Sequence, residues 1–267
     1  MEKIMLENFE GGKTLGIVAH RDDHLVYAGT LLKLTTEYGM KHYEMVLTNN
    51  HLGQSVNGNG TDHSEVIAET RDAEYAAAAK YLGINEPVRL NEPDSGLQYS
   101  CGLRDEAARV IRRVQPDILF ILSQHCRHRD HMQAHEIGLE GAIFAAFNER
   151  LELGESHRTS LVLAVPMMLP QENTVVVDVT KYRKGILAAR AHYGSQVGPE
   201  LNAILDGKLG VGGEQVQRKG TLAADMFYLP SRFPSLLFEG RRPTVSRNGH
   251  SQESGIRTYI QPHLAQI

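Results

Sequence analysis

Short apolar runs alternate with amphipathic stretches through most of this chain, and this alternation restricts its fold more than any other feature. The runs at residues 14–19 and 117–122 have the length and composition of fully buried strands. Residues 25–37, 64–82 and 103–114 carry apolar residues at helical spacing. Strands that alternate with helices predict an α/β fold with a mainly parallel sheet and helices on both faces.

The remaining elements and the domain limits follow from the same patterns. We expect further strands at 43–48, 87–90, 160–165 and 174–179, and further helices at 131–151, 180–194 and 199–205. The 267 residues suit one large domain, which we place at 1–230. Residues 231–267 are rich in Ser, Arg, Gly and Pro, and we interpret them as a C-terminal tail. The tail is either loosely packed, an oligomer contact or an active-site flap.

Composition excludes several classes of protein. The net charge is −4, whereas a nucleic-acid-binding protein normally shows a basic excess or stripe. No window approaches the roughly 20 apolar residues of a membrane span, and the N-terminus does not read as a signal peptide. The two cysteines, Cys101 and Cys126, are too few for a disulfide framework. We therefore expect a soluble cytoplasmic protein with no nucleic-acid partner.

Polar residues of unusual type follow the first predicted strand. A dinucleotide-binding fold would place its glycine fingerprint there, but the chain has His20, Asp22 and Asp23 instead. Two aspartates before a helix can serve as N-caps. A histidine three positions before an aspartate on a tight loop changes that interpretation, because both side chains can turn toward one point.

A second polar cluster follows the strand at 117–122. It contains four of the chain's 13 histidines, which are His125, His128, His131 and His135, together with Asp130. The carboxyl ends of parallel strands share one edge of a sheet, so we expect both clusters to lie on that edge. Two histidines and one aspartate would give three metal ligands and leave a position for water, as catalytic metal sites require.

With these motifs in view, the chain resembles the PIG-L/LmbE-like de-N-acetylase family (N-acetylglucosaminyl deacetylases). Members carry Ala-His-Pro-Asp-Asp-Glu after the first strand and His-x-Asp-His later. Here residues 19–24 read Ala-His-Arg-Asp-Asp-His and residues 128–131 read His-Arg-Asp-His. The resemblance covers roughly residues 14–230. It implies a Rossmann-like three-layer sandwich.

The resemblance also implies a role for each motif residue. His20, Asp23 and His131 would bind one divalent metal, for which this ligand type favours zinc, although iron, cobalt or nickel also suit it. Asp22 would be the general base. His128, if protonated, would stabilise the oxyanion, and Asp130 would orient a histidine through a hydrogen bond. Amide hydrolysis needs an activated water, a polarised carbonyl and a proton for the leaving amine.

Three positions depart from the family pattern. Arg21 replaces the usual Pro, and His24 replaces the usual Glu. His24 is either a fourth ligand or an outward-facing residue, and we expect it to face outward. Some relatives place a Tyr where this chain has Cys126, so any Tyr contribution to the oxyanion site must come from elsewhere.

Other segments carry weaker signals. Arg71 could pair with Glu74 along its helix, whereas the resemblance favours a contact with a substrate hydroxyl. Asp94 could cap a turn or bind substrate. Residues 207–213 are glycine-rich but lack the order of a P-loop, so we expect a flexible loop. The loop at 49–63 is expected to shape substrate choice.

The leading functional hypothesis is hydrolysis of an N-acetyl group from a small amino sugar or its conjugate. One alternative is an amidase that cleaves a larger acyl or thiol-conjugate amide. The other is a non-catalytic metal-binding or carbohydrate-binding protein, against which Asp22 argues because a structural site needs no adjacent base. The resemblance further implies a homo-oligomer, a trimer or a hexamer.

Overall fold

The computed structural model describes residues 6–52, 65–165, 174–195, 224–228 and 257–258. Its strands are β1 Lys13–Val18, β2 Lys41–Thr48, β3 Ile84–Glu92, β4 Ile118–Leu122, β5 Leu161–Val165, β6 Thr174–Asp178, β7 Ala224–Tyr228 and β8 Arg257–Thr258. Its helices are α1 Ala28–Tyr38, α2 Glu65–Leu82, α3 Cys101–Val114, α4 Arg129–Ala145 and α5 Arg183–Arg190. Short 3-10 turns lie at Leu6–Phe9, Asp23–Tyr27, Leu151–Leu153 and Thr180–Tyr182.

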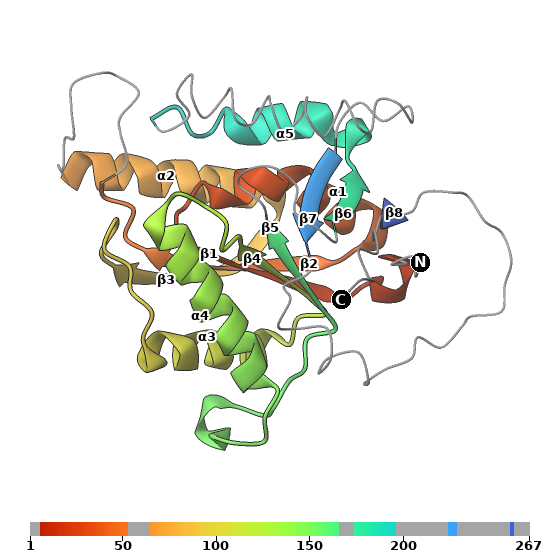
Figure 1. Cartoon of the computed structure of the whole chain (residues 1–267). Helices are drawn as coiled ribbons and strands as arrows, with labels where there is room; N and C mark the ends of the chain where they lie inside the picture. The colour runs from red at the N-terminus through yellow and green to blue at the C-terminus, as the bar shows by residue number, and fades with distance from the viewer. Residues whose placement is uncertain (1–5, 53–64, 166–173, 196–223, 229–256, 259–267) are drawn as a thin grey trace, which may run out of the picture.

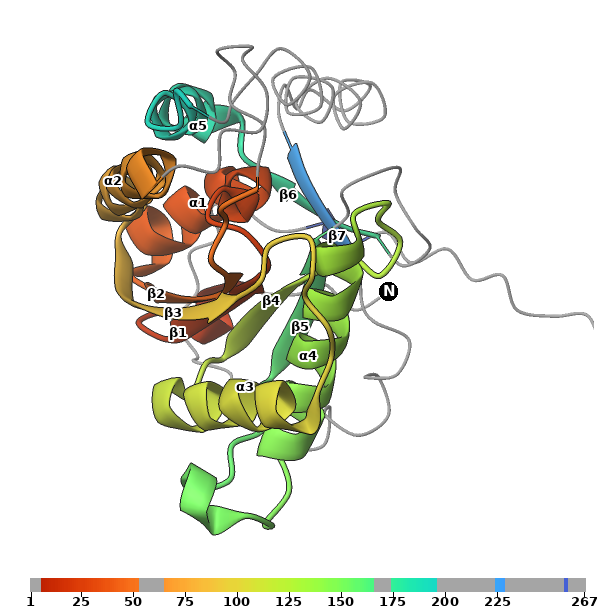
Figure 2. The same cartoon turned by 90° about the vertical axis from the view of Figure 1, so that its left-hand side faces the viewer.

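The strands form one sheet in the order β3-β2-β1-β4-β5-β7-β6-β8. The first five of these pair in parallel, whereas β7, β6 and β8 add antiparallel pairs at one side. Helices α1, α2 and α5 cover one face, and α3 and α4 cover the other (Figures 1 and 2). The predicted α/β three-layer sandwich with a parallel sheet is therefore confirmed.

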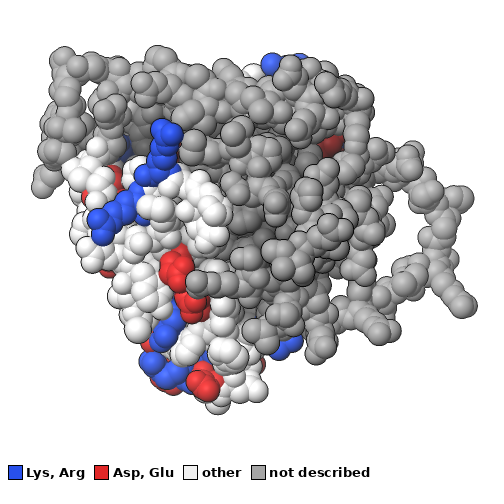
Figure 3. Space-filling view, in the orientation of Figure 1, with Lys and Arg blue, Asp and Glu red and all other residues white. Residues whose placement is uncertain are grey.

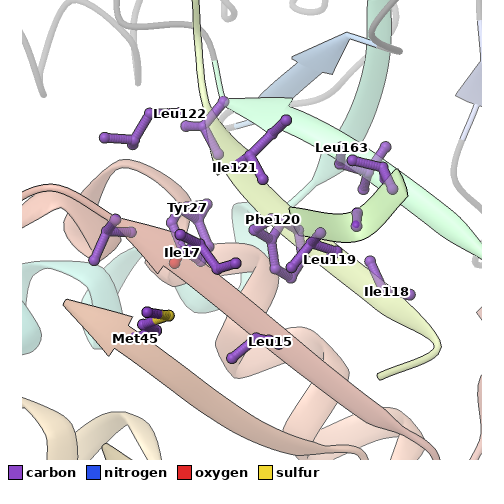
Figure 4. Packing of buried hydrophobic residues seen from close by; sticks show 14 of the residues in the cluster. Leu15, Ile17, Tyr27, Met45, Ile118, Leu119, Phe120, Ile121, Leu122 and Leu163 are labelled. Carbon is purple, nitrogen blue, oxygen red and sulfur yellow. The ribbon is translucent and has the colours of Figure 1, made fainter. Parts of the chain in front are cut away.

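The hydrophobic core includes residues of β1, β4 and β5 and the apolar side chains that pack against them. Every residue of β4 and β5 is buried, as the continuous apolar runs predict for strands covered on both faces. The ring of Tyr27 stacks on Phe120, with centroids 4.8 Å apart, and Ile17 lies beside them (Figure 4). Gly16 leaves room for the Tyr27 hydroxyl, because a Cβ at this position would lie 2.4 Å from that oxygen.

Several predicted boundaries differ from the observed ones. The helix expected at 25–37 begins as a 3-10 turn, and its α-helical part starts at Ala28. The helix expected at 131–151 ends at Ala145. At this end the buried guanidinium of Arg112 donates hydrogen bonds to backbone carbonyl groups. These are the carbonyls of Phe144, Ala145 and Phe147, which a longer helix would use internally.

Some predictions fall outside the described residues. These are the helix at 199–205, the glycine-rich segment at 207–213, most of the loop at 49–63, and most of the tail at 231–267. From the tail, Arg257–Thr258 is described as β8, which pairs with β6. Among the described helices, none is long and apolar enough to cross a membrane. On the described part of the face in Figure 3, acidic and basic side chains lie beside one another.

Candidate metal centre

The two polar clusters of the sequence meet at the carboxyl ends of β1 and β4. These strands are neighbours in the sheet, with Ile17 paired to Ile121. His20 follows β1, and His131 lies in the first turn of α4, after β4. Parallel pairing therefore brings together two loops that are more than a hundred residues apart in the chain.

Donor atoms of three side chains converge between these loops. Nδ1 of His20 lies 3.1 Å from Nε2 of His131 and 3.7 Å from Oδ2 of Asp23. Oδ1 of Asp23 lies 3.1 Å from Nε2 of His131. All three side chains are buried. Two tetrahedral ligands at zinc distances of about 2.0–2.1 Å stand about 3.3 Å apart, so these separations fit one small cation.

The opposite side of the His20 ring faces carboxylates. Its Nε2 lies 3.2 Å from Oδ2 of Asp130 and 3.4 Å from Oδ1 of Asp94. Together with His20 these aspartates form a second group that could hold an ion. However, Asp130 accepts hydrogen bonds from the backbone N–H groups of Ser95 and Leu97, at 2.7 and 3.2 Å. These bonds suit Asp130 to orienting His20 rather than to ligating a metal.

The close contacts within the cluster shift the pKa values of His20, His131 and Asp23. Burial lowers the pKa of His20, but its hydrogen bonds with Asp130, Asp23 and Asp94 outweigh burial and hold it well above 6.5. Burial also lowers the pKa of His131, and the charge of Asp23 overcomes this and raises it to about 10. Burial has the opposite effect on Asp23, but His131 and His20 hold the pKa of this carboxyl well below its ordinary value. A metal must displace the histidine protons, so its affinity will increase with pH.

Asp22 and His128 border the cluster. Asp22 is half-buried, and burial, followed by the charge of Asp23, raises the pKa of its carboxyl. A raised pKa suits a general base, which works best near the operating pH. His128 is exposed, and its ring lies against His20 and His131, with centroids 4.8 and 4.7 Å apart. Burial of part of this ring and the charges of those two histidines lower the pKa of His128, which works against its predicted protonated state.

Arg71 and Asp94, the predicted substrate contacts, lie beside the centre. Arg71 is fully buried and donates from Nη1 to the carbonyl of Asn50. Asp94 accepts from the backbone N–H of Leu52 at 2.8 Å. Burial raises the pKa of Asp94, but His20 and this backbone bond outweigh it and lower the pKa to about 2. Glu74, the alternative partner of Arg71, accepts the N–H and the hydroxyl of Ser195 at 2.7 and 2.6 Å.

Comparison with known proteins agrees with this geometry. Residues 15–142, which hold both motifs, match the family described as PIG-L: GlcNAc-PI de-N-acetylase. A diacetylchitobiose deacetylase from Thermococcus kodakarensis is 29% identical over 136 residues. Residues 15–142 of this chain are therefore similar to the PIG-L/LmbE-like de-N-acetylase family. The aligned segment spans 50% of this chain and 50% of that relative.

Several solved structures share the fold of this chain. The conserved protein TT1542 from Thermus thermophilus is 26% identical, with a TM-score of 0.69, and covers 86% of this chain and 99% of its own. N,N'-diacetylchitobiose deacetylase from Pyrococcus horikoshii is 22% identical, with a TM-score of 0.69, and the match covers 82% of this chain and 84% of that one. GalB, a 4-carboxy-2-hydroxymuconate hydratase from Pseudomonas putida, is 22% identical, with a TM-score of 0.68, and the match covers 84% of this chain and 99% of that one. One fold therefore accommodates more than one chemistry.

Two departures from the family motif connect the loop after β1 to α2, to β2 and to the chain that follows α5. Arg21 is buried, and its Nη2 lies 2.8 Å from Oδ1 of Asp72 in α2. The expectation that His24 faces outward is wrong, because His24 is fully buried. Its Nδ1 lies 3.1 Å from Oε1 of Glu44, and its Nε2 lies 2.9 Å from the hydroxyl of Tyr193. The carboxylate that contacts this imidazole therefore comes from β2.

Sequence reasoning missed the residues that support the loop from behind. Glu44 is fully buried in β2 and also accepts the hydroxyl of Tyr75 at 3.0 Å. Tyr193 donates to the carbonyl of Arg21 at 2.7 Å. A charged residue in the middle of an otherwise buried strand was the signal for Glu44, since a buried charge needs partners. Residues 192–196, which include Tyr193, resemble a family motif, but the sequence assigned Tyr193 no role, because its contact with Arg21 bridges 172 residues of sequence.

Proposed function

We propose that this protein hydrolyses the N-acetyl group of an amino sugar or its conjugate, releasing acetate and a free amine. The observation that carries the proposal is the convergence of His20, Asp23 and His131 on one point, with Asp22 adjacent. The family match at residues 15–142 and the deacetylase activity named for the Thermococcus kodakarensis relative support the same reaction.

The donor set fits a divalent cation, and we propose zinc. Two neutral imidazoles and one carboxylate suit zinc in both ligand type and spacing. When bound, such a cation supplies Lewis acidity that polarises an amide carbonyl and makes a coordinated water more acidic. His128 belongs to an alternative donor set with His20 and His131, but it is exposed whereas Asp23 is buried.

The chain's own residues would carry the proton transfers. Asp22, whose pKa is raised, accepts a proton from the attacking water. His128 lies at the exposed side of the centre, where a ring N–H can donate a hydrogen bond to the oxyanion. The proton that Asp22 takes from water can then pass to the leaving amine. Asp130 holds His20 with Nδ1 directed to the cation. Arg71 and Asp94, beside the centre, would contact substrate hydroxyl groups.

The test is release of acetate by the purified, zinc-loaded protein. The panel contains N-acetylglucosamine, diacetylchitobiose and N-acetylglucosamine conjugates, with amides of longer acids as a second arm. We expect acetate and free amine in equal amounts, and much slower release from the variant Asp22→Asn, which should retain zinc. Release of only longer acids would favour the broader amidase. Zinc binding without cleavage of any amide would overturn the proposal in favour of a binding protein.

A further inference from the structure

The two nitrogens of His131 have different partners. Nε2 faces the cation position, 3.1 Å from both Oδ1 of Asp23 and Nδ1 of His20. Nδ1 lies on the other side of the ring, 3.2 Å from Sγ of Cys126. The sulfur therefore contacts a predicted metal ligand from the side away from the metal.

The chemistry of a ligating imidazole fixes which atom donates in this contact. A histidine that binds a cation through Nε2 is neutral and carries its proton on Nδ1. That N–H needs an acceptor, because an unpaired buried donor costs about 1–3 kcal/mol. Within the described chain, the acceptor in range is Sγ of Cys126.

The sulfur itself is held in place. Cys126 is half-buried, and its Sγ also accepts the backbone N–H of His128 at 3.4 Å. This second contact fixes the sulfur relative to the turn that begins α4 at Arg129. Cys126 thus connects the loop after β4 to the histidine that the next helix presents.

His20 shows the same arrangement with the nitrogens exchanged. Its Nε2 faces Oδ2 of Asp130, and its Nδ1 faces the cation position. Metal-binding histidines usually donate their second N–H to a carboxylate, a carbonyl or water. His131 has a thiol in that place.

We propose that Cys126 is a positioning residue of the metal centre, whose Sγ accepts the Nδ1–H of His131 and thereby directs Nε2 to the cation. This inference rests on the metal site of the proposed function. It assigns the sulfur no bond to the metal and no part in the acetyl transfer to water.

Zinc affinity, measured by competition with a chelator, tests the inference. Loss of an orienting partner typically weakens metal binding about 10- to 100-fold, so we expect Cys126→Ala to raise the Kd for zinc by about tenfold or more. Cys126→Ser retains an acceptor and should recover most of that loss. Cys101→Ala is the matched control, because Cys101 is an exposed cysteine at the start of α3, and its Kd should equal that of the wild type.

Two results would separate this inference from the proposed function. If the wild-type protein binds no zinc, the metal site fails and the inference fails with it. If the wild type binds zinc and the Kd of Cys126→Ala is unchanged, only the inference is overturned. Circular dichroism of Cys126→Ala and Cys126→Ser checks that the two variants are folded, and we expect their spectra to match that of the wild type.

The cobalt-loaded wild-type protein provides a second measurement. A positioning sulfur predicts the absorption of a centre with nitrogen and oxygen ligands. A thiolate-to-cobalt charge-transfer band in the near ultraviolet would show that Cys126 is a ligand and would overturn the positioning role. This readout needs no variant and no substrate.

Discussion

The loops after β1 and after β4 contribute to the same centre but are supported in different ways. In the first loop, His20, Arg21, Asp23 and His24 are buried, and partners in β2, α2 and the chain after α5 hold them. In the second loop, much of residues 124–129 is exposed, and Asp130 and His131 are its buried members. We infer that the first loop is a fixed half of the site and that the second presents groups to substrate and solvent.

The strongest test of this contrast lies within the first loop. We expect Asp23→Ala to abolish zinc binding and activity, because it removes a ligand. Asp22→Asn should keep zinc and lower kcat by about 10²- to 10⁴-fold, the usual contribution of a general base. Metal content and acetate release of the two variants, measured side by side, distinguish a ligand from a base. Equal zinc loss in both would contradict the assignment.

His128→Gln tests the exposed loop. We expect zinc content to stay the same and kcat to fall by about 10²- to 10³-fold, as loss of an oxyanion donor does elsewhere. The measurement is kcat together with metal content by elemental analysis. If the variant loses its zinc, His128 is a metal ligand together with His20 and His131. The exposed loop after β4 would then hold the metal as well as contact the substrate.

Glu44→Gln tests the support of the fixed half. Burial raises the pKa of Glu44, but the charge and hydrogen bond of His24, with those of His42, lower it from 4.5 to about 2. The ionised carboxyl therefore stabilises the fold above pH 4.5, and this contribution is lost as pH falls from 4.5 toward 2. A shift of this size corresponds to about 3 kcal/mol at neutral pH.

Chemical denaturation of both proteins between about pH 7 and pH 3 measures the difference, since this range spans 4.5, where the carboxyl of the unfolded chain takes up its proton. We expect Glu44→Gln to be less stable at neutral pH and the gap to narrow as pH falls. A gap that is constant over this range would show that the ionised state of Glu44 does not support the fold.

Tyr193→Phe is the mildest change. It removes the hydroxyl that contacts Nε2 of His24 and the carbonyl of Arg21, both buried. We expect the free energy of unfolding to drop by about 1–2 kcal/mol, with little effect on zinc affinity. Thermal unfolding and zinc titration check this pair of outcomes. A large loss of zinc affinity with unchanged stability would mean that Tyr193 positions the ligands directly.

The comparison also shows which features the sequence could predict. The parallel sheet and the meeting of the two polar loops were predictable, because buried strands read as continuous apolar runs and the histidines directly follow them. The residues at the centre are close in sequence to strand ends, so parallel pairing alone brings them together. The ligand set His20, Asp23 and His131 came from the resemblance, and the structure brings these three together.

The supporting residues were harder to predict because their partners are distant in sequence. His24 was expected to face outward, since its partners Glu44 and Tyr193 lie 20 and 169 residues away. The end of α4 depended on Arg112, which a helical pattern at 131–151 does not reveal. Periodicity reports which face of an element is buried, but it does not report which polar groups meet there.

The central claim is that His20, Asp23 and His131 hold one divalent cation, and anomalous diffraction from crystals of the zinc-loaded protein tests it most directly. We predict one anomalous peak about 2.0–2.2 Å from Nδ1 of His20, Nε2 of His131 and a carboxylate oxygen of Asp23. A peak on the Nε2 side of His20, between Asp94 and Asp130, or no peak at either position, would contradict the account.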